Sequence, residues 1–467
     1  MPQRNRRTFL KGAAGVIGGS ALATGSTVAT GEGETGRFLI NLREVSKSEV
    51  PDDVEIVHDV SAADILVARG DQSRVGGATA TAPDVKIDLS DDTTGAVEEQ
   101  DGPSVADGGS ASHNHDGTAS FTELQWDKRQ QGVSGELTDK PGGGKFVHDT
   151  TTGEGARVAV VDSGVDDSHP DLANAVNAEL SANFTTDPFD FRPNGAGDHG
   201  THVAGTIAAT NDNDGPRGGA LGTAPDAEIV ALRMFSGLEG HFGDAIAAFE
   251  YAANVGCDAI NYSVGLIFSD LENYPTLLPT YKQMYEQIAA YVRSQGTVLV
   301  NSAGNSALDM DDPTVMSLPT EAEGVFGVSA TGPIGFGWGD KHSDNEAKWL
   351  TGDRLEEPTT DPAPYTNYGD AVDVSAGGGN YDPSGPANYY RDLVFSTIQG
   401  GYGWKAGTSM AAPQVSGAVA LVRSLNPDAT VDEVESLIRD TASMPDEGET
   451  YHGAGHLTLE ALIDAAE

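Results

Sequence analysis

The sequence has very few cysteines and few basic residues. Its 467 residues include a single cysteine, Cys257, and 27 lysines and arginines against 71 aspartates and glutamates, which gives a formal net charge of −44. One cysteine excludes a framework of disulfide bonds, and its apolar neighbours predict a small buried side chain. So large a negative charge repels phosphate backbones and anionic lipid headgroups. General nucleic-acid binding and membrane-surface binding are therefore excluded.

Long apolar runs are also missing. After the N-terminal segment, no stretch has about 18 uninterrupted apolar residues, so no stable membrane insertion is expected. High charge with modest hydrophobicity is typical of disorder as well, but periodic apolar segments run through the second half and predict a folded core. The acidic excess is spread over the whole chain, which favours adaptation to molar salt, where the Debye length falls to about 3 Å. An acidic protein from ordinary cytosol is the alternative.

The first residues have the composition of an export signal. Paired arginines, Arg6 and Arg7, precede Phe9-Leu10-Lys11 and a weakly apolar stretch rich in glycine and alanine. This arrangement resembles a twin-arginine signal, whose low hydrophobicity distinguishes it from a membrane anchor. We therefore interpret residues 1–30 as a twin-arginine signal peptide and expect a secreted, extracellular protein. A chance basic start on a cytosolic chain is the other interpretation.

Composition divides the rest of the chain into three regions. Residues 31–95 carry short apolar runs separated by acidic or small residues, and they predict a small α/β unit near the lower size limit for independent stability. Residues 96–118 contain almost nothing to bury and are interpreted as a flexible linker. Two histidines there, His113 and His115, are either solvated or metal ligands. Residues 119–467 form the third region.

In this third region, short β-branched runs alternate with stretches of helical length. Examples of the runs are residues 157–161, 228–232 and 297–300, and helix-length stretches cover residues 244–255 and 281–294. Such alternation predicts an α/β fold with a doubly wound, mostly parallel sheet. Active sites of these folds lie at the carboxyl ends of the strands.

Three segments place a reactive side chain at a predicted strand end or helix start. Asp162 ends an apolar strand, His199 precedes a glycine-rich helix start, and Ser409 lies at the head of an apolar helix with Pro413 in its first turn. Taken singly, Asp162 is more often a hydrogen-bond acceptor of a turn, and His199 could be a packed residue or a metal ligand. Together they supply a nucleophile, a base and a carboxylate that orients the base.

The motifs around these residues, DSGVDDSHPDL, HGTHVAGT and GTSMAAP, resemble those of subtilisin-like serine proteases, the subtilases, over about residues 120–467. The resemblance implies a subtilisin-like fold and a serine endopeptidase. Ser409 would form an acyl-enzyme, His199 would act as base, and Asp162 would orient it. Sedolisins are disfavoured because they place a glutamate where this chain has His199.

Two other functions were weighed. An α/β-hydrolase esterase requires a G-x-S-x-G elbow and the chain order Ser, Asp, His, and this sequence has neither. A catalytically silent binding scaffold is disfavoured because all the catalytic positions are occupied.

The resemblance also implies residues that bind the substrate. Asn305, in the sequence Ala303-Gly304-Asn305, would donate to the oxyanion together with the Ser409 backbone N–H, and the nearby Asn301 is the alternative. The pocket for the residue before the cut would have Ala303 and Gly304 in one wall. An extended edge would pair with the substrate backbone and consist of Ser263, Val264 and Gly265.

Calcium is the cofactor that the resemblance implies. Asp171 matches a family ligand, and the loop 211–214 offers further oxygens from Asn211 and Asn213. The alternative is a solvated acidic loop. His202 is expected to be structural, and His169 to be a loop residue.

The family likeness assigns roles to the remaining segments. Residues 31–95 would be the chain's own propeptide, acting as inhibitor and chaperone, and the linker would be the processing region. Residues 333–362 would be an insertion that shapes the substrate cleft. A monomer that cleaves protein and peptide substrates, without an accessory C-terminal module, is expected.

Overall fold

The computed structural model describes residues 36–77, 79–89, 105–106, 124–135, 137, 144–214, 218–269, 271, 277–334, 358–380 and 389–467. The predictions for the signal peptide, for His113 and His115, and for most of the 333–362 insertion lie outside these residues. Within them, no helix is long and apolar enough to cross a membrane.

A seven-stranded sheet forms the centre of the molecule, and every neighbouring pair in it is parallel. The order of strands reverses beside β7, where β9 lies on one side and β12 on the other. In spatial order, the strands are β17 (Val374–Gly377), β16 (Val325–Thr331), β14 (Val298–Ser302), β12 (Ala259–Tyr262), β7 (Arg157–Asp162), β9 (Glu228–Arg233) and β8 (Ala182–Asn183). The doubly wound parallel sheet predicted from the sequence is therefore confirmed.

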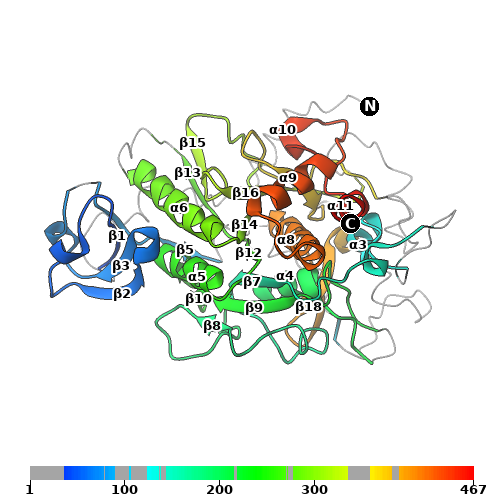
Figure 1. The fold of residues 1–467 in the computed structure, drawn as a ribbon, viewed down its shortest axis with the longest axis horizontal. Coiled ribbons are helices and arrows are strands. Elements are labelled where there is room, and N and C mark those ends of the chain that lie inside the picture. The colour runs from blue at the N-terminus through cyan, green and yellow to red at the C-terminus, as the bar shows by residue number, and fades with distance from the viewer. Residues whose placement is uncertain are drawn as a thin grey trace.

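Alternate residues of β7 enter two separate cores. Val158 and Val160 belong to the core that includes α4 (His199–Ala208) and α8 (Thr408–Leu425). Ala159 and Val161 belong to the core that includes α5 (Phe242–Asn254) and α6 (Leu277–Ser294). Because successive side chains of a strand point to opposite faces, the sheet is covered by helices on both sides (Figure 1).

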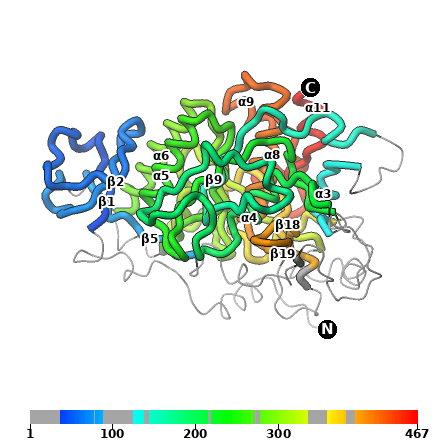
Figure 2. The backbone as a smooth tube through the Cα atoms, turned by 90° about the horizontal axis from the view of Figure 1, so that it is seen from below, coloured from blue at the N-terminus to red at the C-terminus, as the bar shows by residue number. Residues whose placement is uncertain are grey.

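The N-terminal unit is a four-stranded antiparallel sheet in the order β2–β3–β1–β4, and it lies at one end of the molecule (Figures 1 and 2). Its strands are β1 (Arg37–Asn41), β2 (Glu55–Val60), β3 (Ile65–Arg69) and β4 (Thr81–Pro83). The expectation of α-helices in this unit is wrong for the described residues, where only single-turn 3₁₀ helices occur. Only β2 and β3 are consecutive strands that also pair. The connections from β1 to β2 and from β3 to β4 each skip one strand, and they contain the 3₁₀ turns Lys47–Glu49 and Gln72–Arg74 instead of α-helices.

The N-terminal unit packs on α5 and α6. Leu39 and Val67 of its sheet belong to the same core as Phe242 of α5 and Tyr281 of α6. The chain then continues as β5 (Lys86–Asp88), which pairs with β11 (Glu239–His241) of the hairpin that starts at β10 (Phe235–Ser236).

Residues 124–135 lie at the opposite end of the molecule from the N-terminal unit (Figure 1). Helix α3 (Trp126–Gln130) is largely buried, and Gln125 just before it exchanges two hydrogen bonds with the backbone of Leu221, one to the carbonyl at 2.8 Å and one from the N–H at 2.9 Å. The remaining described strands form β13 (Leu266–Ser269) with β15 (Val315–Leu318), and β18 (Val394–Ile398) with β19 (Gly401–Lys405) and β6 (Val105–Ala106). The C-terminal helices are α9 (Val431–Thr441), α10 (Glu449–His452) and α11 (Leu459–Ala466).

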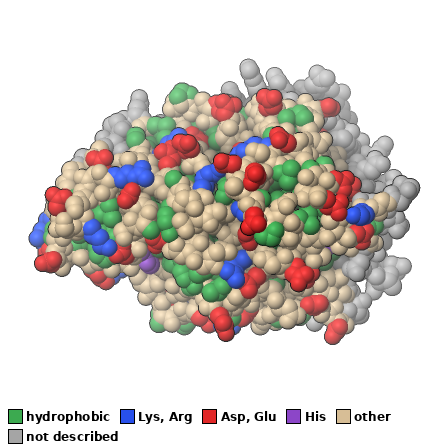
Figure 3. Space-filling view, viewed as in Figure 1, with side chains coloured by type: hydrophobic (Ala, Val, Ile, Leu, Met, Phe, Trp, Pro, Cys, Tyr) green, Lys and Arg blue, Asp and Glu red, His purple; other side chains and the backbone are tan. Residues whose placement is uncertain are grey.

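Acidic side chains are scattered over the face shown in Figure 3 and do not gather in one patch. This distribution agrees with an acidic excess spread along the whole sequence.

Candidate active site

Asp162 and His199 form a buried pair at the carboxyl edge of the sheet. Asp162 is the last residue of β7, and its Oδ1 accepts a hydrogen bond from the Ser163 backbone N–H at 2.6 Å. His199 begins α4, and its Nδ1 lies 2.8 and 2.9 Å from the two carboxylate oxygens of Asp162. Because Nδ1 faces the carboxylate, Nε2 is the nitrogen on the far side of the imidazole ring. This is the geometry of a carboxylate that orients a base.

The close approach of α4 to β7 requires a glycine. A Cβ at Gly200 would lie 2.4 Å from the carbonyl oxygen of Gly164 and 3.1 Å from the Asp162 side chain. Any larger residue would move the helix away from the strand, and the His199–Asp162 bond would be lengthened.

Ser409 is anchored to the end of the neighbouring strand. It is the second residue of α8, and its hydroxyl donates to the Ser263 carbonyl at 3.1 Å. In return, the Ser263 hydroxyl donates to the Ser409 carbonyl at 3.1 Å. Ser263 directly follows β12, which neighbours β7 in the sheet. The helix start also brings a partial positive charge to the Ser409 backbone, where a developing anion would be stabilised.

The two candidate asparagines have different surroundings. The Asn305 side-chain oxygen accepts from the Thr408 backbone N–H at 2.8 Å and from the Thr408 hydroxyl at 2.9 Å. Asn301 donates to the carbonyls of Tyr262 and Val264 at 2.7 and 2.9 Å, and its oxygen accepts from Thr320 at 2.7 Å. Asn301 therefore joins strands, whereas Asn305 is held beside the residue that precedes Ser409.

The loop that carries Asn305 depends on a residue that sequence reasoning did not single out. The Asn367 amide donates to the Ala303 carbonyl at 2.8 Å and accepts from the N–H groups of Ser306 and Leu308 at 3.0 Å. A Cβ at Gly304, whose φ is +103°, would lie 2.4 Å from the same amide. The available signal was its place in the segment Tyr365–Gly369, which follows the 333–362 insertion and resembles the subtilase pattern.

The predicted substrate-binding residues follow β12 or directly precede Asn305, and most of them are buried. Ser263, Val264 and Ala303 are buried, and Gly265 and Gly304 are partly exposed. The Ala303 side chain packs in a small cluster with Met310. Any binding by buried members of this set would therefore use their backbone groups.

The predicted calcium ligands form a network of hydrogen bonds. Asp171 is buried, with one carboxylate oxygen accepting from the Asn213 N–H at 3.0 Å and the other from the Ala220 N–H at 2.7 Å and the Tyr402 hydroxyl at 2.8 Å. The Asn211 side-chain oxygen accepts from the Gly219 N–H at 2.7 Å.

These N–H and O–H donors already hold the Asp171 carboxylate without an ion. Its Oδ1 accepts one hydrogen bond and so keeps a second lone pair that a calcium ion could use. No group of three or more His, Cys, Asp or Glu side chains suited to a metal occurs in the described part of the chain. Calcium stays a prediction, and no step below uses it.

Three further side chains have structural surroundings. His202 is fully buried, and burial holds its pKa well below the usual value, as expected of a structural residue. His169 is also buried and bonds the Gly401 carbonyl at 2.8 Å, so it is more than a loop residue. Cys257 is buried as predicted, and burial raises the pKa of its thiol to about 12.

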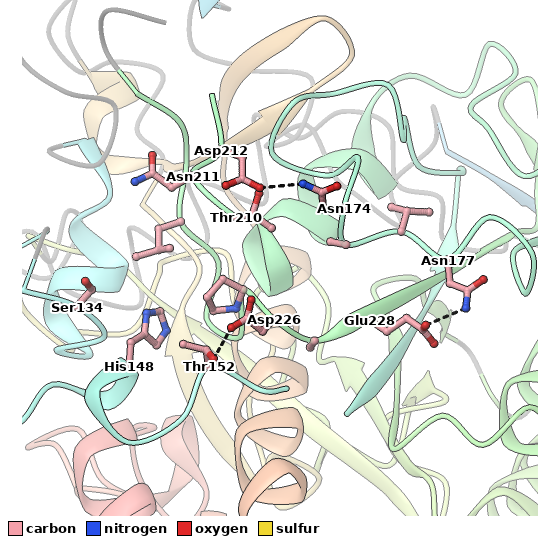
Figure 4. Close-up of a pocket in the computed structure, with 15 residues that line it drawn as sticks. Ser134, His148, Thr152, Asn174, Asn177, Thr210, Asn211, Asp212, Asp226 and Glu228 are labelled. Atoms are coloured by element: carbon pink, nitrogen blue, oxygen red, sulfur yellow. Dashed lines mark hydrogen bonds between the residues drawn. The ribbon is translucent and has the colours of Figure 1, made fainter. Parts of the chain in front are cut away.

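A polar cavity of about 740 Å³ opens at the edge where β9 begins, opposite the edge that ends in Asp162 (Figure 4). Its acidic residues are already engaged, since Asp212 accepts from Asn174, Asp226 from Thr152, and Glu228 from Asn177.

A model described as the Subtilase family matches residues 153–457 of this chain. The chain belongs to the subtilase family. This match confirms the assignment as a subtilisin-like serine endopeptidase with an Asp, His, Ser triad. The chain is 31% identical over 313 residues to Subtilisin NAT of Bacillus subtilis subsp. natto, an alignment that covers 66% of each protein. It is equally identical to Subtilisin of Bacillus pumilus, with 66% of this chain and 91% of that protein aligned.

Among solved structures, this subtilase is similar to the epidermin leader peptide processing serine protease EpiP from Staphylococcus aureus. The TM-score is 0.68 and the identity 18%, with 93% of this chain and 99% of the other covered. At that identity, the likeness shows the fold alone.

Proposed function

We propose that this subtilase is a secreted, halophilic endopeptidase that cleaves protein and peptide substrates through an acyl-enzyme on Ser409. The observation that supports this most is the buried Asp162–His199 pair, which lies on the same sheet edge as the start of the Ser409 helix. Three elements of the chain, β7, α4 and α8, thus contribute one catalytic group each.

In the proposed reaction, the Ser409 oxygen attacks the peptide carbonyl while His199 Nε2 accepts the hydroxyl proton. The same nitrogen then protonates the leaving amine, and the peptide bond breaks to give the acyl-enzyme. Water, deprotonated by His199, releases the acid product. Asp162 holds the imidazole by its Nδ1 and stabilises its charged form, because its carboxylate is buried and faces the ring.

The Ser409 hydroxyl has to change its hydrogen bond before it reacts. It donates to the Ser263 carbonyl in this structure, whereas proton transfer requires it to point at His199. The change requires a rotation about the Cα–Cβ bond, and catalytic hydrogen bonds commonly tighten only when substrate binds.

We propose that the Asn305 amide and the Ser409 backbone N–H stabilise the tetrahedral oxyanion. Thr408 supports this role, because its N–H and hydroxyl fix the Asn305 side-chain oxygen and so determine the direction of the amide NH₂. The substrate backbone would run along the edge at Ser263–Gly265, with Ala303 and Gly304 in the wall of the pocket.

The N-terminal unit, within residues 31–95, is proposed to act as inhibitor and chaperone, and the 96–118 linker as the processing region. Packing of its sheet on α5 and α6 and the pairing of β5 with β11 support a docked inhibitor. The Met234 N–H, between β9 and β10, donates to the Asp162 carbonyl at 2.9 Å, so this hairpin leaves the sheet beside the proposed catalytic group. Export as a monomer by the twin-arginine signal completes the proposal.

A fluorophosphonate probe tests the enzymatic part. Labelling at Ser409 of the processed protein, with hydrolysis of a peptide library, is expected. An unlabelled Ser409 in a folded protein would favour the scaffold alternative. N-terminal sequencing of secreted protein made in high salt tests the export and processing steps.

The halophilic part is tested by the half-life of activity in dilute buffer and in 0.5, 1 and 3 M salt. Carboxylate repulsion predicts a steep gain up to about 1 M, where the Debye length is already about 3 Å. An equal half-life in all four conditions would contradict this part alone.

A further inference from the structure

A buried charged cluster joins the N-terminal unit to the first turn of α5. It consists of Arg37, Asp84 and Asp244, which are 6%, 8% and 1% exposed. We call it the interface cluster. The Arg37 guanidinium donates from Nε to Asp84 at 2.8 Å and from Nη2 to Asp244 at 2.5 Å. One arginine thus bridges a carboxylate of its own unit and a carboxylate of the catalytic region.

Further polar groups complete the cluster. Asp84 accepts from the Gly243 backbone N–H at 2.7 Å, which also satisfies a donor at the start of α5. His58 Nε2 lies 2.9 Å from Asp244, and His241 Nδ1 lies 3.8 Å from it. Removing the guanidinium would leave two carboxylates in a buried site without the cation that contacts both of them.

A second ion pair crosses the same interface but lies in solvent. Lys86 of β5 contacts Glu239 of β11, and their side chains are 49% and 57% exposed. Exposed pairs are weak and are screened by salt, whereas buried pairs are screened far less. The two pairs therefore respond differently to the molar salt in which this acidic protein is proposed to work.

We propose that the interface cluster holds the N-terminal unit on the catalytic region independently of salt, while the exposed pair does not contribute at molar salt. The proposal rests on the proposed role of residues 31–95 as an inhibitor, because an inhibitor has to stay bound under working conditions. Surface charge attraction is lost at that ionic strength, and the buried guanidinium keeps its partners. The cluster also restricts the partner, since a unit without Arg37 would leave Asp244 buried without its cation.

The test uses the full chain carrying Ser409→Ala, so that no self-cleavage occurs. Hydrogen exchange is followed at two backbone groups that bond across the interface, the N–H of Phe242 to Val85 and the N–H of Leu89 to Leu238. Measurements at pH 8, where free histidines are neutral, are made in 0.5, 1 and 3 M NaCl. Arg37→Met is compared with Lys86→Met, since each variant removes one cation of the N-terminal unit.

Arg37→Met is expected to lower the protection of both amides roughly 100-fold relative to the parent at every salt concentration. Lys86→Met is expected to lower it less than about 5-fold at 0.5 M and not at all at 3 M. Equal losses in the two variants, or a loss in Arg37→Met that disappears at 3 M, would overturn the proposal.

Two more variants distinguish the loss of these charge contacts from a general folding defect. Arg37→Lys keeps the charge but loses the two-pronged geometry, so a loss of about 10-fold, independent of salt, is expected. Arg37→Met combined with Asp84→Asn and Asp244→Asn removes all three charges and should regain at least about 10-fold of the protection. If Arg37→Lys loses no amide protection, or if the triple variant recovers none, packing and not charge holds the N-terminal unit.

Exchange reports docking and does not depend on activity. Inhibition is measured separately, as peptide hydrolysis by the chain with native Ser409. The assay is run under the conditions in which hydrogen exchange shows that the N-terminal unit is docked. Strong hydrolysis with a docked unit would remove the inhibitor role and leave the interface cluster intact.

Discussion

Two buried aspartates nine residues apart, Asp162 and Asp171, have the same charge and opposite surroundings. Asp162 at the end of β7 faces the imidazole of His199, a group that gains and loses protons. The Asp171 carboxylate faces two backbone N–H groups and the hydroxyl of Tyr402. The first carboxylate is set against a titratable partner that can take part in a reaction. The second accepts hydrogen bonds from neutral donors, with His169 as its titratable neighbour, and it holds a loop in shape.

The largest expected effect is that of Ser409→Ala. Loss of the nucleophile should reduce kcat about 10⁶-fold, the size of the loss known for subtilisin itself, and leave the precursor unprocessed. The measurement is peptide hydrolysis together with the mass of protein made in a protease-deficient host. A mature-sized variant would mean that another enzyme performs the processing.

Asp162→Asn and Asp171→Asn test the comparison directly. Asp162→Asn should lower kcat by ~10⁴, because the amide no longer selects the reactive tautomer of His199. Asp171→Asn should leave kcat nearly unchanged but destabilise the fold by about 1–3 kcal/mol, because its NH₂ cannot accept from the backbone donors. Both are measured as steady-state kinetics and Tm in the same salt. The opposite pattern would exchange the roles of the two residues.

Asn305→Ala should lower kcat roughly 10²–10³-fold (~2.7–4 kcal/mol) with little change in KM, because the amide acts mainly in the transition state. Asn301→Ala is the matched control. It should mainly lower the Tm, since Asn301 joins the carbonyls of Tyr262 and Val264. A catalytic loss confined to Asn301→Ala would move the oxyanion role to the strand.

Acid is expected to weaken the C-terminal region. His452 and His456 contact Ser375 of β17 through their Nδ1 atoms at 2.7 and 3.2 Å, and burial lowers their pKa values to about 4 and about 3. Each histidine has a pKa of about 6.5 when unfolded, so below that pH the unfolded chain binds more protons than the folded one. Stability is complete above about pH 6.5 and falls on acidification, by roughly 1.4 kcal/mol per pH unit for each histidine until its folded pKa is reached.

The measurement is Tm between pH 7 and 4.5 at constant molar salt, for the parent and for His456→Asn. The variant should lose Tm less steeply on acidification, because one of the two titrating groups is gone. Identical slopes of Tm against pH in the two proteins would contradict a role of His456 in acid destabilisation. Subtracting one Tm curve from the other removes the contribution of the surface carboxylates.

Removal of calcium should have the smallest effect. Three protein donors hold the Asp171 carboxylate without an ion, so a chelator at constant salt is expected to change the half-life of activity less than about 2-fold. A loss above about 10-fold, reversed by added calcium, would restore the calcium site predicted from the sequence.

The sequence predicts most of the fold and the main catalytic groups, because both depend on local pattern. β-branched runs at strand period determine the central sheet, and Asp162, His199 and Ser409 lie within long motifs. Asn367 was missed because its role arises from a contact with Ala303, more than sixty positions away in the chain. Asn301 and Asn305 could not be separated by spacing alone, since the difference lies in which backbone groups surround each amide.

The calcium prediction also depends on contacts that a sequence does not give. Oxygen-rich residues at Asp171, Asn211 and Asn213 suit a cation when read in sequence, but a sequence does not tell which donors will reach them. Here, backbone N–H groups and Tyr402 arrive from other parts of the chain.

Gln125 imitates a peptide unit, since it gives and receives one hydrogen bond with the same backbone residue, Leu221. A single side chain thereby does what a paired strand residue would do, and it attaches the chain directly before α3. Only a primary amide of that length has the donor and the acceptor in the required places. A glutamate at this position would place a carboxylate oxygen against the Leu221 carbonyl, where a donor is needed. A lysine would place an ammonium donor against the Leu221 N–H, where an acceptor is needed. The attachment at Gln125 is thus sensitive to a change of a single atom.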